Sequence, residues 1–91
     1  MVKIEQMYFL YIIECADSTL YTGITVDLEK RIKEHNFSEL GAKYTRGRGP
    51  VKLVFLKKFK NRSTASKEEA RIKKLSREEK LKLIKNYSLS I

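Results

Sequence analysis

The sequence predicts an α+β fold, a compact α/β sandwich in which helices flank a small three-stranded antiparallel sheet. Residues 8–15 and 20–25 are rich in aromatic and β-branched side chains and are joined by a short turn, which is typical of a β-hairpin. From residue 27 the apolar side chains recur at helical spacing, and after residue 50 one more strand precedes two helical segments. These patterns give the element order ββαβαα.

The predicted hairpin carries two tyrosines, Tyr11 and Tyr21, ten residues apart. Because side chains alternate along a strand, the two tyrosines share one face of the sheet only if the connecting loop has an odd number of residues. The composition of the turn, residues 16–19, does not decide between an odd and an even loop. Gly23 follows in the second strand, where a glycine either leaves room for a ligand or another backbone, or marks a bulge.

The segment after the hairpin, residues 27–37, is predicted as a helix with Asp27 or Thr25 as its N-terminal cap. Positions i, i+3, i+4 and i+7 of this helix form one stripe, which consists of Leu28, Arg31, Ile32 and His35. Packing of the two apolar members on the sheet brings Arg31 and His35 to the edge of the same interface. A charged pair held against a hairpin with two tyrosines is a candidate site.

Residues 38–50 are predicted as a loop, because they hold three of the four glycines and the only proline. Within this loop Lys43, Arg46 and Arg48 are interleaved with Tyr44. Cations on a glycine-rich loop suit contacts with backbone phosphates, and a tyrosine can stack on an exposed base. The alternative is a solvated surface loop with Tyr44 packed on the core.

Residues 51–59 are predicted as the third strand, buried on much of both faces, with Val51, Leu53 and Phe55 sharing one face. A helix is predicted to follow from about residue 64. The residues available as its cap are Ser63, Thr64 and Ser66. A third helix is predicted to begin at the capping-box pattern of Ser76 and Glu79.

The second helix carries two adjacent glutamates, Glu68 and Glu69. Each shares a helical stripe with Ile72, so periodicity leaves open which of them faces the sheet. A glutamate among many cations is either a salt-bridge partner or an oxygen ligand for a divalent metal. One carboxylate suffices for magnesium when water and substrate phosphate oxygens supply the other ligands.

Length and charge narrow the class of protein. The 91 residues suffice for a single domain spanning residues 1–91, with its core at about 8–85. No apolar run approaches the roughly 20 residues of a membrane span, no signal peptide is recognisable, and the single Cys15 suits a reducing compartment, so we expect a cytoplasmic protein. The formal charge of +9 indicates a polyanionic partner, above all nucleic acid.

The ordered set of motifs resembles the GIY-YIG nucleases, most closely the small, stand-alone, single-domain bacterial members. Leu10-Tyr11-Ile12 stands at the first family motif, Tyr21-Thr22-Gly23 stands at the second, and residues 27–36 look like the arginine helix. The likeness extends from residue 8 to about residue 84. In this chain Leu10 replaces a motif glycine and Thr22 replaces an isoleucine, while Ile24 and Thr25 stand where many members carry a basic residue.

The resemblance implies a role for each site residue. Tyr11 would be the general base or would orient the attacking water, with Tyr21 as its partner, and Arg31 would clamp the scissile phosphate. His35 would bond phosphate or assist proton transfer. Glu69, rather than its neighbour, would hold Mg²⁺ or Mn²⁺. Since an ordinary tyrosine pKa is about 10, the metal and Arg31 would have to lower it for Tyr11 to act as a base at neutral pH.

The function expected from the resemblance is that of a metal-dependent endonuclease, a hydrolase that cleaves phosphodiester bonds in nucleic acid. With no second domain to read sequence, it would be selective for nucleic-acid structure and would act in DNA repair or processing, with DNA favoured over RNA. We expect a monomer that binds no membrane. The alternatives are a non-catalytic nucleic-acid-binding module with the same fold, and an accessory protein that docks a larger complex.

Overall fold

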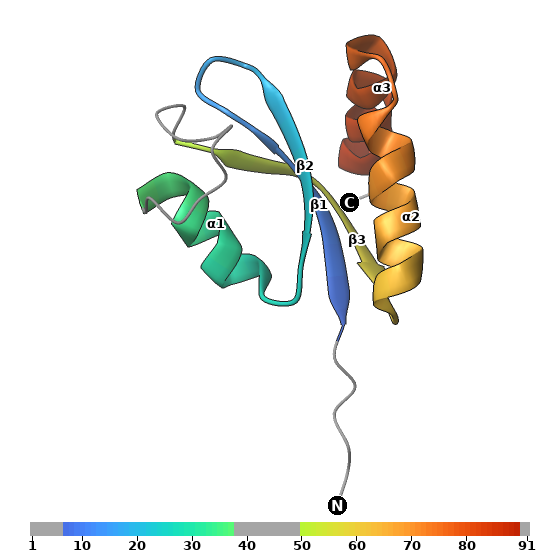
Figure 1. Ribbon diagram of the computed structural model, residues 1–91. Helices are drawn as coiled ribbons and strands as arrows, with labels where there is room; N and C mark the ends of the chain where they lie inside the picture. The colour runs from blue at the N-terminus through green and yellow to red at the C-terminus, as the bar shows by residue number, and fades with distance from the viewer. Residues whose placement is uncertain (1–6, 38–49, 90–91) are drawn as a thin grey trace, which may run out of the picture.

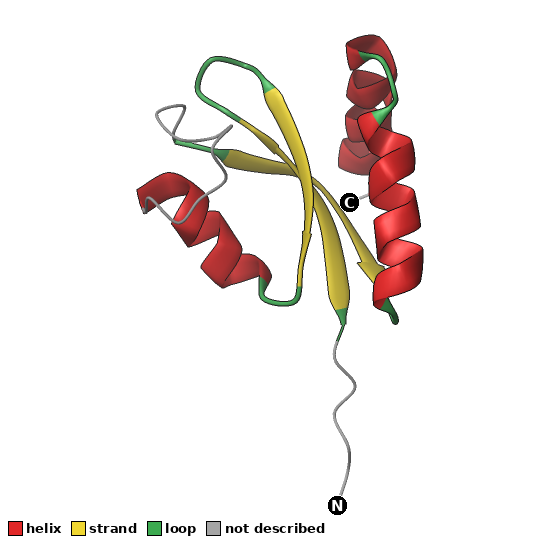
Figure 2. Cartoon of the chain, viewed as in Figure 1, coloured by secondary structure: helices red, strands yellow, loops and turns green. Residues whose placement is uncertain are grey.

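The computed structural model describes residues 7–37 and 50–89, so the predicted phosphate-binding residues Lys43, Arg46 and Arg48 lie outside the described residues. Three strands and three helices follow one another in the predicted order ββαβαα, which confirms the α+β class (Figure 2). In chain order they are β1 (Tyr8–Glu14), β2 (Leu20–Thr25), α1 (Leu28–Phe37), β3 (Lys52–Phe59), α2 (Arg62–Lys73) and α3 (Arg77–Leu89).

The strands form one antiparallel sheet in the order β2-β1-β3, with β1 at its centre. Helix α1 covers one face of this sheet, and α2 and α3 cover the other (Figure 1). Each face has its own apolar cluster. Tyr11 and Ile13 pack with Ile32 on the α1 face, whereas Leu10 and Ile12 pack on the other face with side chains of α2 and α3.

The hairpin register places the two tyrosines on the same face. Tyr11 is paired with Gly23 and Ile13 with Tyr21, so residues of one face alternate across the two strands. Glu14 is paired with Leu20, which leaves a loop of five residues, 15–19. The loop is odd, which decides the choice that the turn composition left open, and it closes with a hydrogen bond from the backbone N–H of residue 18 to the carbonyl of residue 15.

Strand β3 departs from the sequence prediction in two ways. It lies at an edge of the sheet, and within residues 51–59 only Val51 and Phe55 are buried, one in each apolar cluster, so the strand is buried less than predicted. Ile12 pairs with Phe55 whereas Ile13 pairs with Leu53, so one extra residue of β3 forms a bulge. The bulge puts Leu53 and Phe55 on opposite faces, although simple alternation had placed them together.

The helix caps show which local signals the chain uses. Asp27 caps α1, since its side chain accepts a hydrogen bond from the backbone N–H of residue 30 at 3.1 Å. The Ser76 and Glu79 side chains each accept a backbone hydrogen bond from the other residue, which confirms the predicted capping box of α3. The predicted caps of α2 were wrong. Asn61 fills that role, because its side chain accepts from the N–H of residue 64 and its extended backbone suits a cap.

Candidate active site

A buried hydrogen bond between Tyr11 and His35 lies at the centre of the site. The Tyr11 side chain points from the central strand toward α1, and its hydroxyl lies 3.0 Å from His35 Nε2. Tyr11 is 1% exposed and His35 is 4% exposed. The stripe that places His35 one turn after Arg31 on α1 therefore brings the imidazole against the sheet, as the sequence predicted.

Tyr21 completes an aromatic cluster with these two residues. Its ring centroid lies 6.4 Å from that of Tyr11 and 5.3 Å from that of His35, and the contact with His35 is edge-to-face. Edge-to-face packing places the positive edge of one ring against the negative face of another, which fixes ring orientation. Unlike its two neighbours, Tyr21 is only half-buried.

Gly23 has a steric role in this cluster. A Cβ atom at this position would lie 2.5 Å from the Tyr11 hydroxyl oxygen and 2.7 Å from the ring carbon that carries it. The Tyr11 ring thus occupies the space that a side chain on Gly23 would need. The sequence left open a close approach or a bulge, and the structure shows a close approach, made by the side chain of the paired residue.

Arg31 acts on the same hydroxyl group. The guanidinium of Arg31 lowers the pKa of Tyr11, and it pairs with Glu34, with Nη1 and Oε1 3.2 Å apart. The direction of the bond between Tyr11 and His35 depends on the imidazole tautomer. The phenol donates to Nε2 when the imidazole proton is on Nδ1, and the imidazole donates to the phenolic oxygen when the proton is on Nε2.

Two pKa shifts describe the resting state of this pair. Burial raises the pKa of Tyr11 to about 12, although the guanidinium of Arg31 lowers it. Burial lowers the pKa of His35 to about 4, helped by the positive charge of Arg31 and opposed by the negative charge of Glu34. At neutral pH both groups are therefore uncharged. The expected lowering of the Tyr11 pKa by Arg31 is present, but burial outweighs it.

The glutamates of α2 lie on different flanks of the helix. Glu68 accepts hydrogen bonds from Lys57 of β3 and from Arg71, so it is a salt-bridge partner on the β3 side. Glu69 lies on the other flank, and its negative charge reaches the Tyr11 hydroxyl, whose pKa it raises. The structure thus brings Tyr11, Tyr21, Arg31, His35 and Glu69 into one region.

Glu69 has a neighbour that sequence reasoning missed. Lys73 Nζ lies 3.4 Å from a Glu69 carboxylate oxygen, one helical turn further along α2. The spacing of four residues between an acid and a base was the available signal. Across residues 7–37 and 50–89, no three His, Cys, Asp or Glu side chains gather into a metal-binding group, so any metal at Glu69 would take most of its ligands from water and substrate.

The fold and the site define a small α+β domain whose tyrosines, arginine and histidine share one sheet face with a helical carboxylate nearby. The chain belongs to the GIY-YIG family, because the model of the GIY-YIG catalytic domain matches residues 7–82. The fold is accordingly of the nuclease type, and the small single-domain group suspected from the sequence is confirmed by relatives of similar length.

Two of these relatives are named only as UPF0213 proteins. The chain is 58% identical over 77 residues to one from Syntrophus aciditrophicus, covering 85% of this chain and 88% of that protein. It is 55% identical over 83 residues to one from Clostridium perfringens, covering 91% of this chain and 88% of that protein.

Two solution NMR structures resemble this fold. A UPF0213 protein from Bacillus halodurans matches with a TM-score of 0.58 at 46% identity, covering 87% of this chain and 83% of that one. A protein from E. faecalis matches with a TM-score of 0.65 at 38% identity, covering 97% of this chain and 93% of that one.

Proposed function

We propose that this protein is a metal-dependent endonuclease that hydrolyses phosphodiester bonds in nucleic acid. The observation that carries the proposal is the buried Tyr11 hydroxyl, which is hydrogen-bonded to His35 and whose pKa the Arg31 guanidinium lowers. A core tyrosine needs only one hydrogen-bond partner to satisfy its hydroxyl. A hydroxyl between a fixed cation and a neutral imidazole acceptor is instead arranged to give up its proton.

In this mechanism the attacking water loses its proton to the tyrosine pair. Tyr11 is the base, and its own proton passes to His35 Nε2, which is an empty acceptor at neutral pH because of the lowered pKa of His35. The water reaches the pair on the side of Tyr21, because Tyr21 is half-buried while Tyr11 is almost fully enclosed. Arg31 stabilises the phenolate and binds the scissile phosphate with the rest of its planar fork.

In the resting state Tyr11 is a poor base because its pKa is far above neutral. The free energy needed to remove its proton shows how much stabilisation the bound substrate and metal must supply. Passing a proton from Tyr11, with a pKa of about 12, to His35, with a pKa of about 4, is unfavourable by roughly 11 kcal/mol, which stabilisation of the phenolate and the imidazolium must offset. One cation next to a buried oxygen contributes only part of this energy. The site is therefore expected to be active only with a metal ion bound.

Glu69 fits a hard divalent cation such as Mg²⁺ or Mn²⁺. Its carboxylate is 22% exposed, its partner Lys73 is half exposed, and its charge acts on Tyr11. Magnesium is commonly held by one or two carboxylates together with waters and phosphate oxygens, so a single glutamate is an adequate protein ligand. When bound, the metal would supply positive charge that stabilises the negative charge of the transition state.

The protein is further proposed to act as a single-domain cytoplasmic monomer on DNA in repair or processing. The formal charge of +9 supports a nucleic-acid partner. No helix in residues 7–37 and 50–89 has the length and apolarity that a membrane span would require. The second candidate, a binding module without catalysis, is favoured by the near-complete burial of Tyr11, which separates its hydroxyl from solvent in this state.

The test is cleavage of branched, flapped, single-stranded and duplex DNA and RNA with magnesium or manganese. Wild-type protein is compared with Glu69→Ala, Tyr11→Phe and the matched control Glu68→Ala. Glu68 is the adjacent carboxylate on the same helix but faces β3, so its removal takes the same charge away from a different flank. Binding is measured in parallel without divalent metal.

If the protein is an endonuclease, the cleavage rate of Glu69→Ala and of Tyr11→Phe should fall by at least about a hundredfold. Both variants should still bind nucleic acid, and Glu68→Ala should still cleave it. Equal nicking by all four proteins would identify a contaminating nuclease and refute the assignment. Binding of every substrate without cleavage by the wild type would establish the binding module instead.

A further inference from the structure

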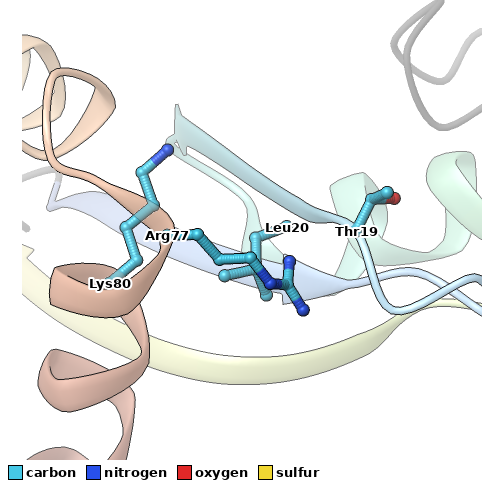
Figure 3. Close-up of a pocket in the computed structure, with 4 residues that line it drawn as sticks. All are labelled: Thr19, Leu20, Arg77 and Lys80. Carbon is cyan, nitrogen blue, oxygen red and sulfur yellow. The ribbon is translucent and has the colours of Figure 1, made fainter.

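An open pocket lies on the opposite side of β2 from the tyrosines, between the hairpin and the start of α3. It has a volume of about 190 Å³ and is lined by Thr19, Leu20, Arg77 and Lys80. Figure 3 shows Arg77 extending from α3 toward the hairpin. One liquid water occupies about 30 Å³, so the pocket has room for a group as large as a phosphate with its hydration.

Two cations line this pocket, and neither has an acidic partner among residues 7–37 and 50–89. Arg77 Nη2 donates a hydrogen bond to the carbonyl oxygen of Ser18 at 2.9 Å, which holds the guanidinium at the pocket. The nearby Glu79 is engaged by the backbone N–H of Ser76 in the capping box.

The position of these cations on α3 is itself unfavourable. They stand at the first and fourth positions of the helix, where the positive end of the helix dipole disfavours cations. The capping box already satisfies the backbone at this end, so the helix terminus itself needs no anion. An anion held by the two side chains would turn this unfavourable placement into a favourable one.

The pocket adjoins the candidate active site along one edge of the sheet. Leu20 directly precedes Tyr21 in β2, so the two side chains point to opposite faces of the same edge strand. Helix α2, which carries Glu69, packs beside β2 and leads through Lys73 to the start of α3. The edge of β2 thus joins the catalytic residues to the two cations.

Among the described residues, the basic side chains are concentrated in the second part of the chain. Residues 50–89 contain 13 Lys and Arg against 4 Asp and Glu, whereas residues 7–37 contain 3 against 5. Helices α2 and α3, which cover one face of the sheet (Figure 1), carry 8 Lys and Arg against 4 Glu. This basic excess favours the approach of a polyanion along α2 and α3.

We propose that the pocket of Arg77 and Lys80 binds a backbone phosphate of the nucleic-acid strand, on the other side of β2 from the phosphate that is cleaved. The proposal rests on the nucleic-acid binding part of the proposed function. Arg77 and Lys80 are positioning residues, since they hold the strand away from the reacting atoms and take no part in proton transfer. They hold the strand along the edge of β2 and so set its direction through the site.

The test compares Arg77→Ala/Lys80→Ala with the control Lys82→Ala/Lys85→Ala. Both double variants remove two cations three residues apart on α3, but the control pair lies outside the pocket. The probe is a labelled short duplex DNA in EDTA, titrated from about 50 to about 200 mM salt. Loss of one phosphate contact is expected to reduce the slope of log affinity against log salt by about 0.9.

If the pocket binds a phosphate, Arg77→Ala/Lys80→Ala should show this reduction in the slope of log affinity against log salt, and Lys82→Ala/Lys85→Ala should show a smaller reduction. With substrate that is cleaved, the pocket variant raises KM severalfold and leaves kcat unchanged, since positioning affects capture of the strand. Lys80→Ala alone, which breaks no hydrogen bond of the described structure, is expected to show part of the same effect. This single variant separates a phosphate contact from the loss of the bond between Arg77 and Ser18.

Equal loss of affinity in both double variants would show an effect of net charge and would refute the phosphate site. The endonuclease and the phosphate site can be refuted separately. A wild type that binds but never cleaves, with the pocket variant still weaker than its control, refutes the endonuclease and keeps the phosphate site. Cleavage with equal binding by both variants refutes the phosphate site alone.

Discussion

His35 is expected to titrate far below a normal histidine. Burial and the nearby guanidinium of Arg31 lower its pKa from 6.5 to about 4. Because the folded-state pKa lies below the unfolded one, the unfolded chain binds the proton first as the pH falls. The stabilisation is therefore complete above about pH 6.5 and is lost progressively as the pH falls toward 4.

The size of this effect follows from the two pKa values. A shift from 6.5 to about 4 corresponds to ~3 kcal/mol in the free energy of unfolding, at 1.36 kcal/mol per pKa unit. Carboxylates also titrate in this range, so the effect of His35 is read from the difference between wild type and His35→Gln. Gln retains a polar group near Tyr11 and cannot be protonated. The stability advantage of the wild type over the variant is expected to shrink by ~3 kcal/mol between pH 7 and pH 4.

The chain offers a direct assay, because His35 is its only histidine. A single set of imidazole signals in NMR spectra reports the pKa without assignment. Two variants then test the causes in opposite directions. Arg31→Gln removes a positive charge and should raise the pKa of His35, whereas Glu34→Gln removes a negative charge and should lower it further.

A His35 pKa at or above 6.5 in the folded wild-type protein would refute this reasoning. It would mean that the imidazole is solvated or paired with an anion, and the proposed role of Nε2 as an empty acceptor at neutral pH would fall with it. Shifts of the same sign in Arg31→Gln and Glu34→Gln would show that a change of conformation, rather than charge, controls the titration.

Three further predictions concern stability. Gly23→Ala should destabilise the protein by about 1–3 kcal/mol in urea unfolding, because its Cβ would lie 2.5 Å from the Tyr11 oxygen; a gain in stability would show that the ring moves freely. Asn61→Ala should cost about 1 kcal/mol through loss of the α2 cap, while Ser63→Ala should stay within about 0.5 kcal/mol, and equal effects would contradict the cap assignment. Stability should fall as the pH rises through 10 toward 12, since the unfolded chain loses the Tyr11 proton first, and Tyr11→Phe should flatten this fall.

The order of elements could be predicted because it depends on local patterns. The change from a two-residue to a helical period at residue 27 marked the end of the hairpin, and the capping box marked the start of α3. The cap of α2 was missed because three hydroxyl residues follow Asn61 closely, and only the backbone conformation selects among such candidates. The burial of β3 was overestimated because an edge position depends on the order of strands in space.

The sequence by itself placed Arg31 and His35 on one side of a helix, since both belong to one stripe of α1. Tertiary structure alone decided which side chains they meet. Whether Tyr11 meets His35 depends on the five-residue loop and on the space above Gly23, and both are set by strand pairing. The choice between Glu68 and Glu69 depends on which strand lies beside each flank of α2. A helical period gives the direction of a side chain, but its partner is fixed only when separate elements pack together.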